Sequence, residues 1–210
     1  SIIRNRRKKI SLDEHVNTRC LVDISYEVDN DFNNDEWNAY KSFSEWIENS
    51  SRELDFKKYY IPVIHSLFSS GSAYLASITE LSKKIHVDSS VLEYAKKYAL
   101  NEKNKCKKIK DYLNEPDLFA CKLVNIIDYI DQECENLKVL IFTSFIETFD
   151  VYKQVLLNVF GEETCCFFNS NMESDDLELN VYKFQNRKNS RILLSDESGG
   201  EGRNFQNADV

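Results

Sequence analysis

The spacing of apolar residues divides the chain into two parts. From about 36 to 130, apolar residues recur every three or four positions, which predicts amphipathic helices. The first is expected after Asp35, an acidic N-cap candidate, and its aromatic stripe is expected to be core: Trp37, Tyr40, Phe43 and Ile47. Further helices are predicted at 59–69, 72–85, 89–100 and 117–133. Ahead of them, residues 20–28 (CLVDISYEV) have strand composition and are expected to edge a sheet.

After residue 136 the pattern alternates between continuous apolar runs and amphipathic stretches. The apolar runs predict buried strands: KVLIFTSF (138–145), TCCFFNS (164–170) and RILLSD (191–196). Helices are predicted between them, at 147–161 with Gly161 as the cap and at 172–188. Such alternation builds right-handed βαβ units, so we expect an α/β fold with a helical N-terminal segment followed by a parallel sheet. Ligands should meet the carboxyl ends of the strands, at 143–145 and 195–202.

Composition and charge exclude several classes of protein. No apolar run is long enough for a membrane span or a secretory signal, so we expect no membrane partner and an intracellular, cytoplasmic location, nucleoid-associated in a bacterium. The six cysteines form no C-x-x-C pair, which predicts no zinc site and buried thiols, with adjacent Cys165 and Cys166 on opposite strand faces. Residues 29–37 resemble a calcium loop but have Asn34 and Tyr40 where glycine and glutamate are required, so we expect a solvated connector.

A net charge of -8 argues against general affinity for nucleic acid, although a groove needs only a local basic patch. Two basic runs are candidates: Arg4, Arg6, Arg7, Lys8 and Lys9, and the lysines at 103, 105, 107, 108 and 110. We expect the second run to face solvent. The chain begins on Ser1, and we expect it to be a segment of a longer polypeptide.

Three of the five glycines fall at 199, 200 and 202, within SDESGGEGRNF (195–205). A Walker loop would need a lysine and a hydroxyl where Arg203 and Asn204 stand, and a dinucleotide fingerprint would need glycine in place of Phe205. What remains is a strand-to-helix turn whose N–H groups approach an anion or a sugar, with Ser195 and Ser198 as further donors. A tight turn without a ligand is the alternative.

The segment ILLSDESGGEGRNFQNAD (192–209) resembles the fifth motif of superfamily two helicases, in the form carried by Snf-type and RapA-like double-strand DNA translocases. KVLIFTSFIETFDVYKQVL (138–156) resembles the fourth motif and its helix in the second RecA-like lobe. SIIRNRRKKI (1–10) is similar to the exit from the first lobe, and SLFSSGSAYLASI (66–78) to the helix between the lobes. The resemblance implies a connector and helical interlobe region at 1–118. It also implies a truncated, P-loop NTPase-like second lobe, the helicase C-terminal domain, at 119–210.

The resemblance also implies roles for individual residues. Seven residues would face the nucleic-acid backbone: Thr143, Ser144, Phe145, Ser195, Glu197, Gly199 and Gly200. Gly202 and Asn204 would face the ribose and phosphates of a nucleotide, and Arg4, Arg6 and Arg7 would serve nucleic acid or the lobe interface. The implied partners are double-stranded DNA, with RNA also open, and a first RecA-like lobe in the same polypeptide.

ATP and magnesium are implied for the full-length protein. The chain has no Walker lysine, acidic box or sixth motif, so we expect no catalytic residue, bound cofactor, metal site or ATP hydrolysis in this chain alone. A truncated sheet edge would favour self-association. Two alternatives stay open: an interaction module joined to a Rossmann-like domain that binds a phosphorylated small molecule, and an inactive, motor-like scaffold.

Overall fold

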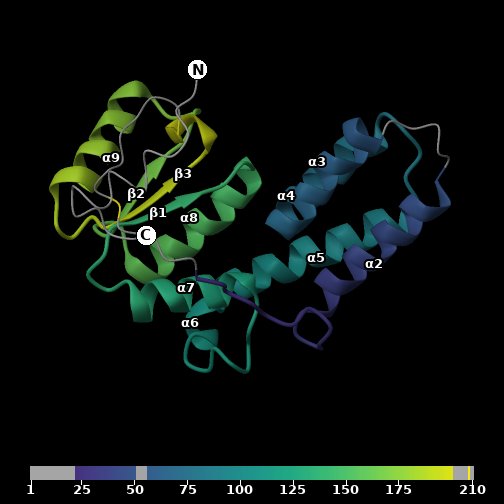
Figure 1. Ribbon diagram of the computed structural model, residues 1–210, viewed down its shortest axis with the longest axis horizontal. Coiled ribbons are helices and arrows are strands. Elements are labelled where there is room, and N and C mark those ends of the chain that lie inside the picture. Colours follow the sequence, from purple (N-terminus) through teal and green to yellow (C-terminus); the bar gives the residue numbers. More distant parts are fainter. Residues whose placement is uncertain (1–21, 51–55, 201–207, 209–210) are drawn as a thin grey trace, which may run out of the picture.

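The computed structural model describes residues 22–50, 56–200 and 208, in a helical half and a sheet half (Figure 1). The helical half contains α2 (Asn34–Asn49), α3 (Phe56–Ser69), α4 (Gly71–Ser82) and α5 (Ser89–Lys107). The sheet half contains α6 (Ile109–Tyr112), α7 (Lys122–Glu133), β1 (Val139–Phe142), α8 (Ile146–Phe160), β2 (Cys165–Phe168), α9 (Ser174–Asn186), β3 (Ile192–Ser195) and the 3-10 turn η1 (Glu197–Gly200). The predicted fold class, a helical segment followed by a small parallel sheet, is confirmed.

The helices of the first half pack around an aromatic and aliphatic core. Phe43 of α2 meets Tyr74 of α4 edge to face, with 5.9 Å between ring centroids. At the start of α4 the backbones of α4 and α5 approach closely, because a Cβ on Gly71 would lie 2.9 Å from the carbonyl carbon of Tyr98. Glu102 of α5 accepts hydrogen bonds from the amide nitrogen of Gly71 at 3.0 Å and so helps to cap α4.

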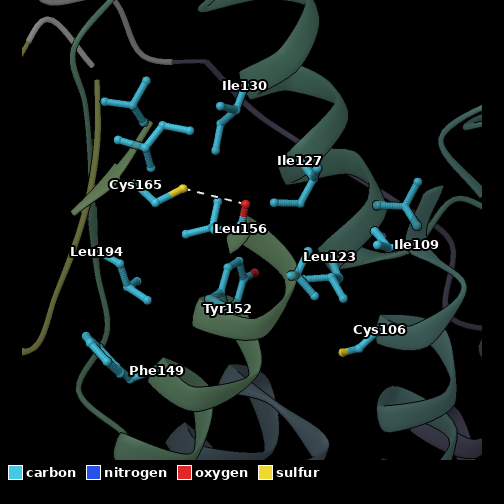
Figure 2. Packing of buried hydrophobic residues seen from close by; sticks show 14 of the residues in the cluster. Cys106, Ile109, Leu123, Ile127, Ile130, Phe149, Tyr152, Leu156, Cys165 and Leu194 are labelled. Carbon is cyan, nitrogen blue, oxygen red and sulfur yellow. Dashed lines mark hydrogen bonds between the residues drawn. The ribbon is translucent and has the colours of Figure 1, made fainter. Parts of the chain in front are cut away.

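The sheet has three parallel strands in the order β1-β3-β2. Every residue of β2 and β3 is buried, whereas β1 becomes progressively more exposed toward Phe142. Helices α7 and α8 cover one face, where Ile127, Tyr152 and Leu156 pack toward Cys165 and Leu194 (Figure 2). Helix α9 covers the other face. Gly161 ends α8 with φ of 80°, a conformation that favours glycine, as the sequence predicted.

The adjacent cysteines confirm the predicted alternation along β2. Cys165 belongs to the core beneath α8, and its thiol donates a weak hydrogen bond to the carbonyl of Leu156 at 3.5 Å (Figure 2). Cys166 packs on the other face with Phe184 of α9. Burial raises the pKa of Cys165 to about 12, so this group stays a neutral thiol at physiological pH.

Residues 22–28, the described part of the predicted strand 20–28, form no strand. Side chains of neighbouring helices hold this segment instead: Asn125 of α7 donates to the carbonyl of Ser25 at 2.8 Å, and the hydroxyl of Tyr26 donates to Glu36 at 2.7 Å. Val22 and Ile24 stay exposed. Strand composition was therefore insufficient, because side chains of α2 and α7 bind this segment and it pairs with neither edge strand of the sheet, β1 or β2.

The prediction of a solvated connector at 29–37 holds only in part: Asp29, Asp31 and Asn34 are exposed, but α2 begins at Asn34 and Asn33 is internal. Asn33 is fully buried, takes the N-cap position of α2 in place of Asp35, and donates to the carbonyl oxygens of Glu27 and Ala120 at 2.6 and 2.9 Å. One buried amide thus joins this loop to the segment that precedes α7. Its polar composition serves internal hydrogen bonds.

Lys105 corrects the expectation that the lysines at 103–110 face solvent. It is buried, its ammonium donates to Asn33 Oδ1 at 2.9 Å, and it lies 4.1 Å from the ring centroid of Phe32. Burial lowers its pKa. The other four lysines of the run are exposed. Within the described ranges, no helix is both long and apolar enough to cross a bilayer.

Candidate nucleic-acid interface

The two motifs after β1 and β3 lie at the same edge of the sheet. Phe142 and Ser195 are register partners in the parallel ladder, and the amide nitrogen of Thr143 donates to the carbonyl of Ser195 at 3.0 Å. Because β3 is the central strand, its carboxyl end also lies beside that of β2. The predicted meeting of the two motifs follows from this pairing.

A cleft of about 600 Å³ opens beside these strand ends. Four residues predicted to face nucleic acid line it: Thr143, Ser144, Phe145 and Glu197. Ser144 and Glu197 are exposed, and Thr143 and Phe145 are half-buried. The other lining residues come from α3, α7, β1 and α8, namely His65, Phe68, Ser69, Ile126, Ile141, Phe142, Thr148 and Tyr152. The helical half therefore forms a wall of the cleft.

The turn after β1 exposes the hydroxyl of Ser144. The amide nitrogen of Phe145 donates to Thr143 Oγ1 at 3.3 Å, which closes a short turn directly before α8. Phe145 is the N-cap of α8 and provides no side-chain cap, so the first N–H groups of this 15-residue helix keep their donor capacity. In the part of the chain that the structure describes, no group hydrogen-bonds to the Ser144 hydroxyl. A phosphate oxygen could accept from it.

Asp196 organises the turn after β3. Its carboxylate accepts from the amide nitrogens of Ser170 at 2.8 Å and Ser198 at 3.1 Å, and from the hydroxyl of Ser198. Partial burial raises the pKa of Asp196, but these hydrogen bonds outweigh burial and bring it below the ordinary value. The ionised carboxylate thus ties the loop after β2 to η1, and Glu197 remains exposed at the rim of the cleft.

Ser195 and Gly199 lie inside the turn. Ser195 has no exposed surface, and its hydroxyl donates to the carbonyl of Asp196 at 2.9 Å. Gly199 is buried, and a Cβ at this position would lie 2.0 Å from Ser195 Oγ and 3.1 Å from Phe168 Cδ1. Both residues support the turn from within, whereas the resemblance assigned them contacts with the nucleic-acid backbone. In this arrangement the Ser195 side chain does not reach solvent.

The remaining predicted site residues divide between η1 and the undescribed part of the chain. Gly200 ends η1. Gly202 and Asn204 lie outside the described residues, as do the basic residues Arg4, Arg6 and Arg7. Their predicted roles stay predictions.

Hydroxyl groups that had no predicted role hold α3, which forms one wall of the cleft, against α8. Thr148 of α8 is buried, and its hydroxyl lies 2.7 Å from those of both Ser69 and Ser70 at the junction of α3 and α4. Lys122 of α7 donates to the carbonyl of Phe68 at the end of α3. The run SSGS at 69–72 was the available signal, because it places several short hydroxyl groups between two helices.

The electrostatics of the cleft are modest. Its lining residues include Glu197 and His65 but neither lysine nor arginine. A phosphate in it would therefore be bound by hydroxyl and N–H donors, with little local positive charge from these residues. Among the described residues, no group of three or more histidine, cysteine, aspartate or glutamate side chains could hold a metal ion.

Comparison with known families assigns the sheet half. Residues 121–210 match the family model of the helicase conserved C-terminal domain, a span that begins just before α7 and includes all three strands. The boundary predicted between 118 and 119 stays a prediction. The comparisons found no matching curated protein and no matching solved structure. The match supports a helicase C-terminal domain over these residues.

Proposed function

We propose that the chain supplies the helical interlobe region and part of the second RecA-like lobe of an ATP-dependent nucleic-acid translocase. The observation that carries this proposal is the shared cleft. Thr143, Ser144 and Glu197, from two motifs about fifty residues apart, line one cleft inside a region that matches the helicase C-terminal domain. The Snf-type, RapA-like placement, and with it double-stranded DNA as the substrate, rests on the resemblance of the two motifs.

The chemistry of the cleft suits binding without base readout. Hydroxyl and backbone N–H groups bind phosphate oxygens and sugars, which are the same at every base pair. Ser144 and the first turn of α8 supply such donors. A translocase needs contacts of this kind because it must advance over any sequence.

The helical half would limit how the nucleic acid enters. His65 and Phe68 of α3 face the strand ends across the cleft, and the hydroxyl contacts of Thr148 fix α3 against α8. A strand bound at Ser144 would therefore pass close to α3. This contact gives the interlobe helices a direct part in holding the substrate.

ATP and magnesium belong to the proposal only for the intact protein. Gly202 and Asn204 would contribute to the ribose and phosphate side, whereas the lysine, acidic and arginine groups that neutralise a transferring phosphoryl group would come from elsewhere in the polypeptide. The chain alone would not hydrolyse ATP. We place the intact protein inside the cell, with the first RecA-like lobe as the partner of this domain.

The proposal is tested by adding a negative charge to the cleft. Ser144→Asp in the intact protein should weaken binding to a mixed-sequence DNA duplex by about tenfold, because a carboxylate would oppose the phosphate that Ser144 contacts. Ser90→Asp is the matched control, since Ser90 is an exposed residue of α5 that does not line the cleft.

Fluorescence anisotropy with a labelled duplex at fixed salt would measure both variants. Equal affinity of the wild-type protein and Ser144→Asp would contradict the proposal. A parallel titration with duplex RNA distinguishes the two substrates: tighter binding of RNA would exclude the DNA assignment while leaving the cleft as the binding site.

A further inference from the structure

A pocket on the helical half combines aromatic rings with a carboxylate. Trp37 and Tyr40 of α2, Phe68 of α3 and Glu36 line a pocket of about 300 Å³, together with Val28 and Leu67. This volume lies at the lower end of the range for ligand sites, about 300 to 1,000 Å³. It is large enough to hold one side chain of a partner. Only Phe68 is shared with the cleft at the strand ends.

The rings keep much of their surface open. Trp37 and Tyr40 are stacked with 5.7 Å between centroids, and Tyr40 lies 6.1 Å from Phe68 at an interplanar angle of 42°. Tyr40 is 41% exposed and Phe68 55%, whereas Phe43 of the same stripe is 2% exposed. The expectation that the whole stripe is core therefore holds for Phe43 but fails for Tyr40.

Glu36 adds a carboxylate to the residues that line this pocket. Glu36 is 9% exposed, and its Oε1 accepts the hydroxyl of Tyr26 at 2.7 Å. Throughout the described ranges, no donor is hydrogen-bonded to Oε2 and no lysine or arginine nitrogen lies within ion-pair distance of the carboxylate. Lys105 and Lys122 line a separate, smaller cavity of about 30 Å³ together with Glu36, whose charge attracts both ammonium groups from beyond ion-pair distance. None of the residues that line the aromatic pocket is basic.

We propose that this pocket binds a cationic side chain of a partner protein, a lysine ammonium in its plain or methylated form. A cation over the face of an aromatic ring is attracted by the negative π-surface, and a nearby carboxylate adds to the attraction. The same charge opposes a nucleotide, whose phosphate would approach Glu36. The charge of the pocket therefore favours a cationic side chain over a nucleotide.

Two probes of the same shape, one cationic and one neutral, test whether the positive charge of the ligand contributes to binding in this pocket. Nα-acetyl-trimethyllysine methylamide carries the cation, and its analogue with a tert-butyl group has nearly the same shape without charge. Each would be titrated into the full chain while the fluorescence of Trp37 is followed, since the second tryptophan, Trp46, is buried. The cation should bind at least about fivefold more tightly than the neutral analogue. Equal binding of the two would overturn the proposal.

Two variants assign the binding to these side chains. Tyr40→Leu keeps apolar area but removes a π-face, and it should weaken binding of the cation by about fivefold while leaving the neutral analogue nearly unaffected. Glu36→Gln should act in the same direction. Tyr94→Leu is the control, because Tyr94 is a half-buried tyrosine of α5 outside the pocket.

Three further results would overturn the proposed cation site. Unchanged affinity in both pocket variants, or no saturable change with the cation, would overturn the proposal. Tighter binding of adenosine monophosphate than of the cation would make the pocket a base-stacking surface and overturn it too. Duplex binding by the Ser144 variants is a separate measurement, so failure here leaves the proposed function untouched.

Discussion

The contact between Gly199 and Ser195 gives a prediction for the turn after β3. Gly199→Ala would place a methyl group 2.0 Å from Ser195 Oγ, so the serine must rotate away and lose its hydrogen bond to Asp196. The φ angle of Gly199 lies outside the left-handed region, so lack of space, and not backbone strain, decides the outcome. Overpacking and a displaced buried hydroxyl together should lower the free energy of unfolding by about 2 kcal/mol.

A double-mutant cycle isolates this contact. Ser195→Ala alone should cost about 1 kcal/mol, the loss of one hydrogen bond. In the double variant the oxygen at 2.0 Å is gone, and the closest remaining atoms are Phe168 Cδ1 at 3.1 Å and the residue 195 Cβ at 3.3 Å. The double variant should therefore lose at least about 1 kcal/mol less unfolding free energy than the two single variants lose together.

Urea unfolding followed by circular dichroism would measure the four proteins of the cycle. Gly161→Ala is the control, because Gly161 has φ of 80° and nothing within 4 Å of the added Cβ. It should be destabilising by about 1 to 2 kcal/mol from backbone strain alone, and its effect should add to that of Ser195→Ala. Additive effects of Gly199→Ala and Ser195→Ala would refute the steric argument.

Three further predictions concern buried or hydrogen-bonded charges. Glu102→Ala should lower the free energy of unfolding by about 2 kcal/mol, because it removes the carboxylate that accepts from the amide nitrogens of Gly71 and Ser72 at the start of α4. Glu93→Ala, at an exposed position of α5, should have little effect in the same urea unfolding experiment. Equal losses in the two variants would contradict the capping role. The pKa of Asp196 is lowered on folding, so its contribution to stability is complete above about pH 4 and is lost as pH falls through the folded-state pKa. The free energies of unfolding of the wild-type protein and Asp196→Asn should therefore become equal in acid. A difference between them that does not change with pH would exclude this linkage. Lys105→Ala should lower the free energy of unfolding by about 1 to 3 kcal/mol, because Lys105 is buried. Lys103→Ala, at an exposed position of the same helix, should change it negligibly. A larger loss in Lys103→Ala than in Lys105→Ala would show that position 105 is not internal.

The sheet half could be predicted from the sequence because its strands are continuous apolar runs. Strands buried on both faces carry that pattern, and the parallel arrangement then places their carboxyl ends together. The meeting of Thr143 with the turn after Ser195 follows from this rule alone. The burial of Ser195 does not, because it depends on how η1 folds back over the end of β3.

The helical half was predicted less completely because its details depend on tertiary contacts. Helix positions followed the apolar spacing, but nothing in one helix indicates that Phe68 would face strand ends some seventy residues away. Lys105 had a signal: it lies seven residues after Tyr98, which is buried on the same helix, and so shares its helix face. The charged run around it hid that spacing.

The most direct test of the central claim is ATP turnover by the intact protein with and without double-stranded DNA. DNA should stimulate turnover by the wild-type protein and by Ser90→Asp but not by Ser144→Asp, because the carboxylate opposes the phosphate at the strand ends. Turnover that DNA does not stimulate, or equal stimulation in Ser144→Asp, would contradict the assignment of this cleft to a nucleic-acid motor.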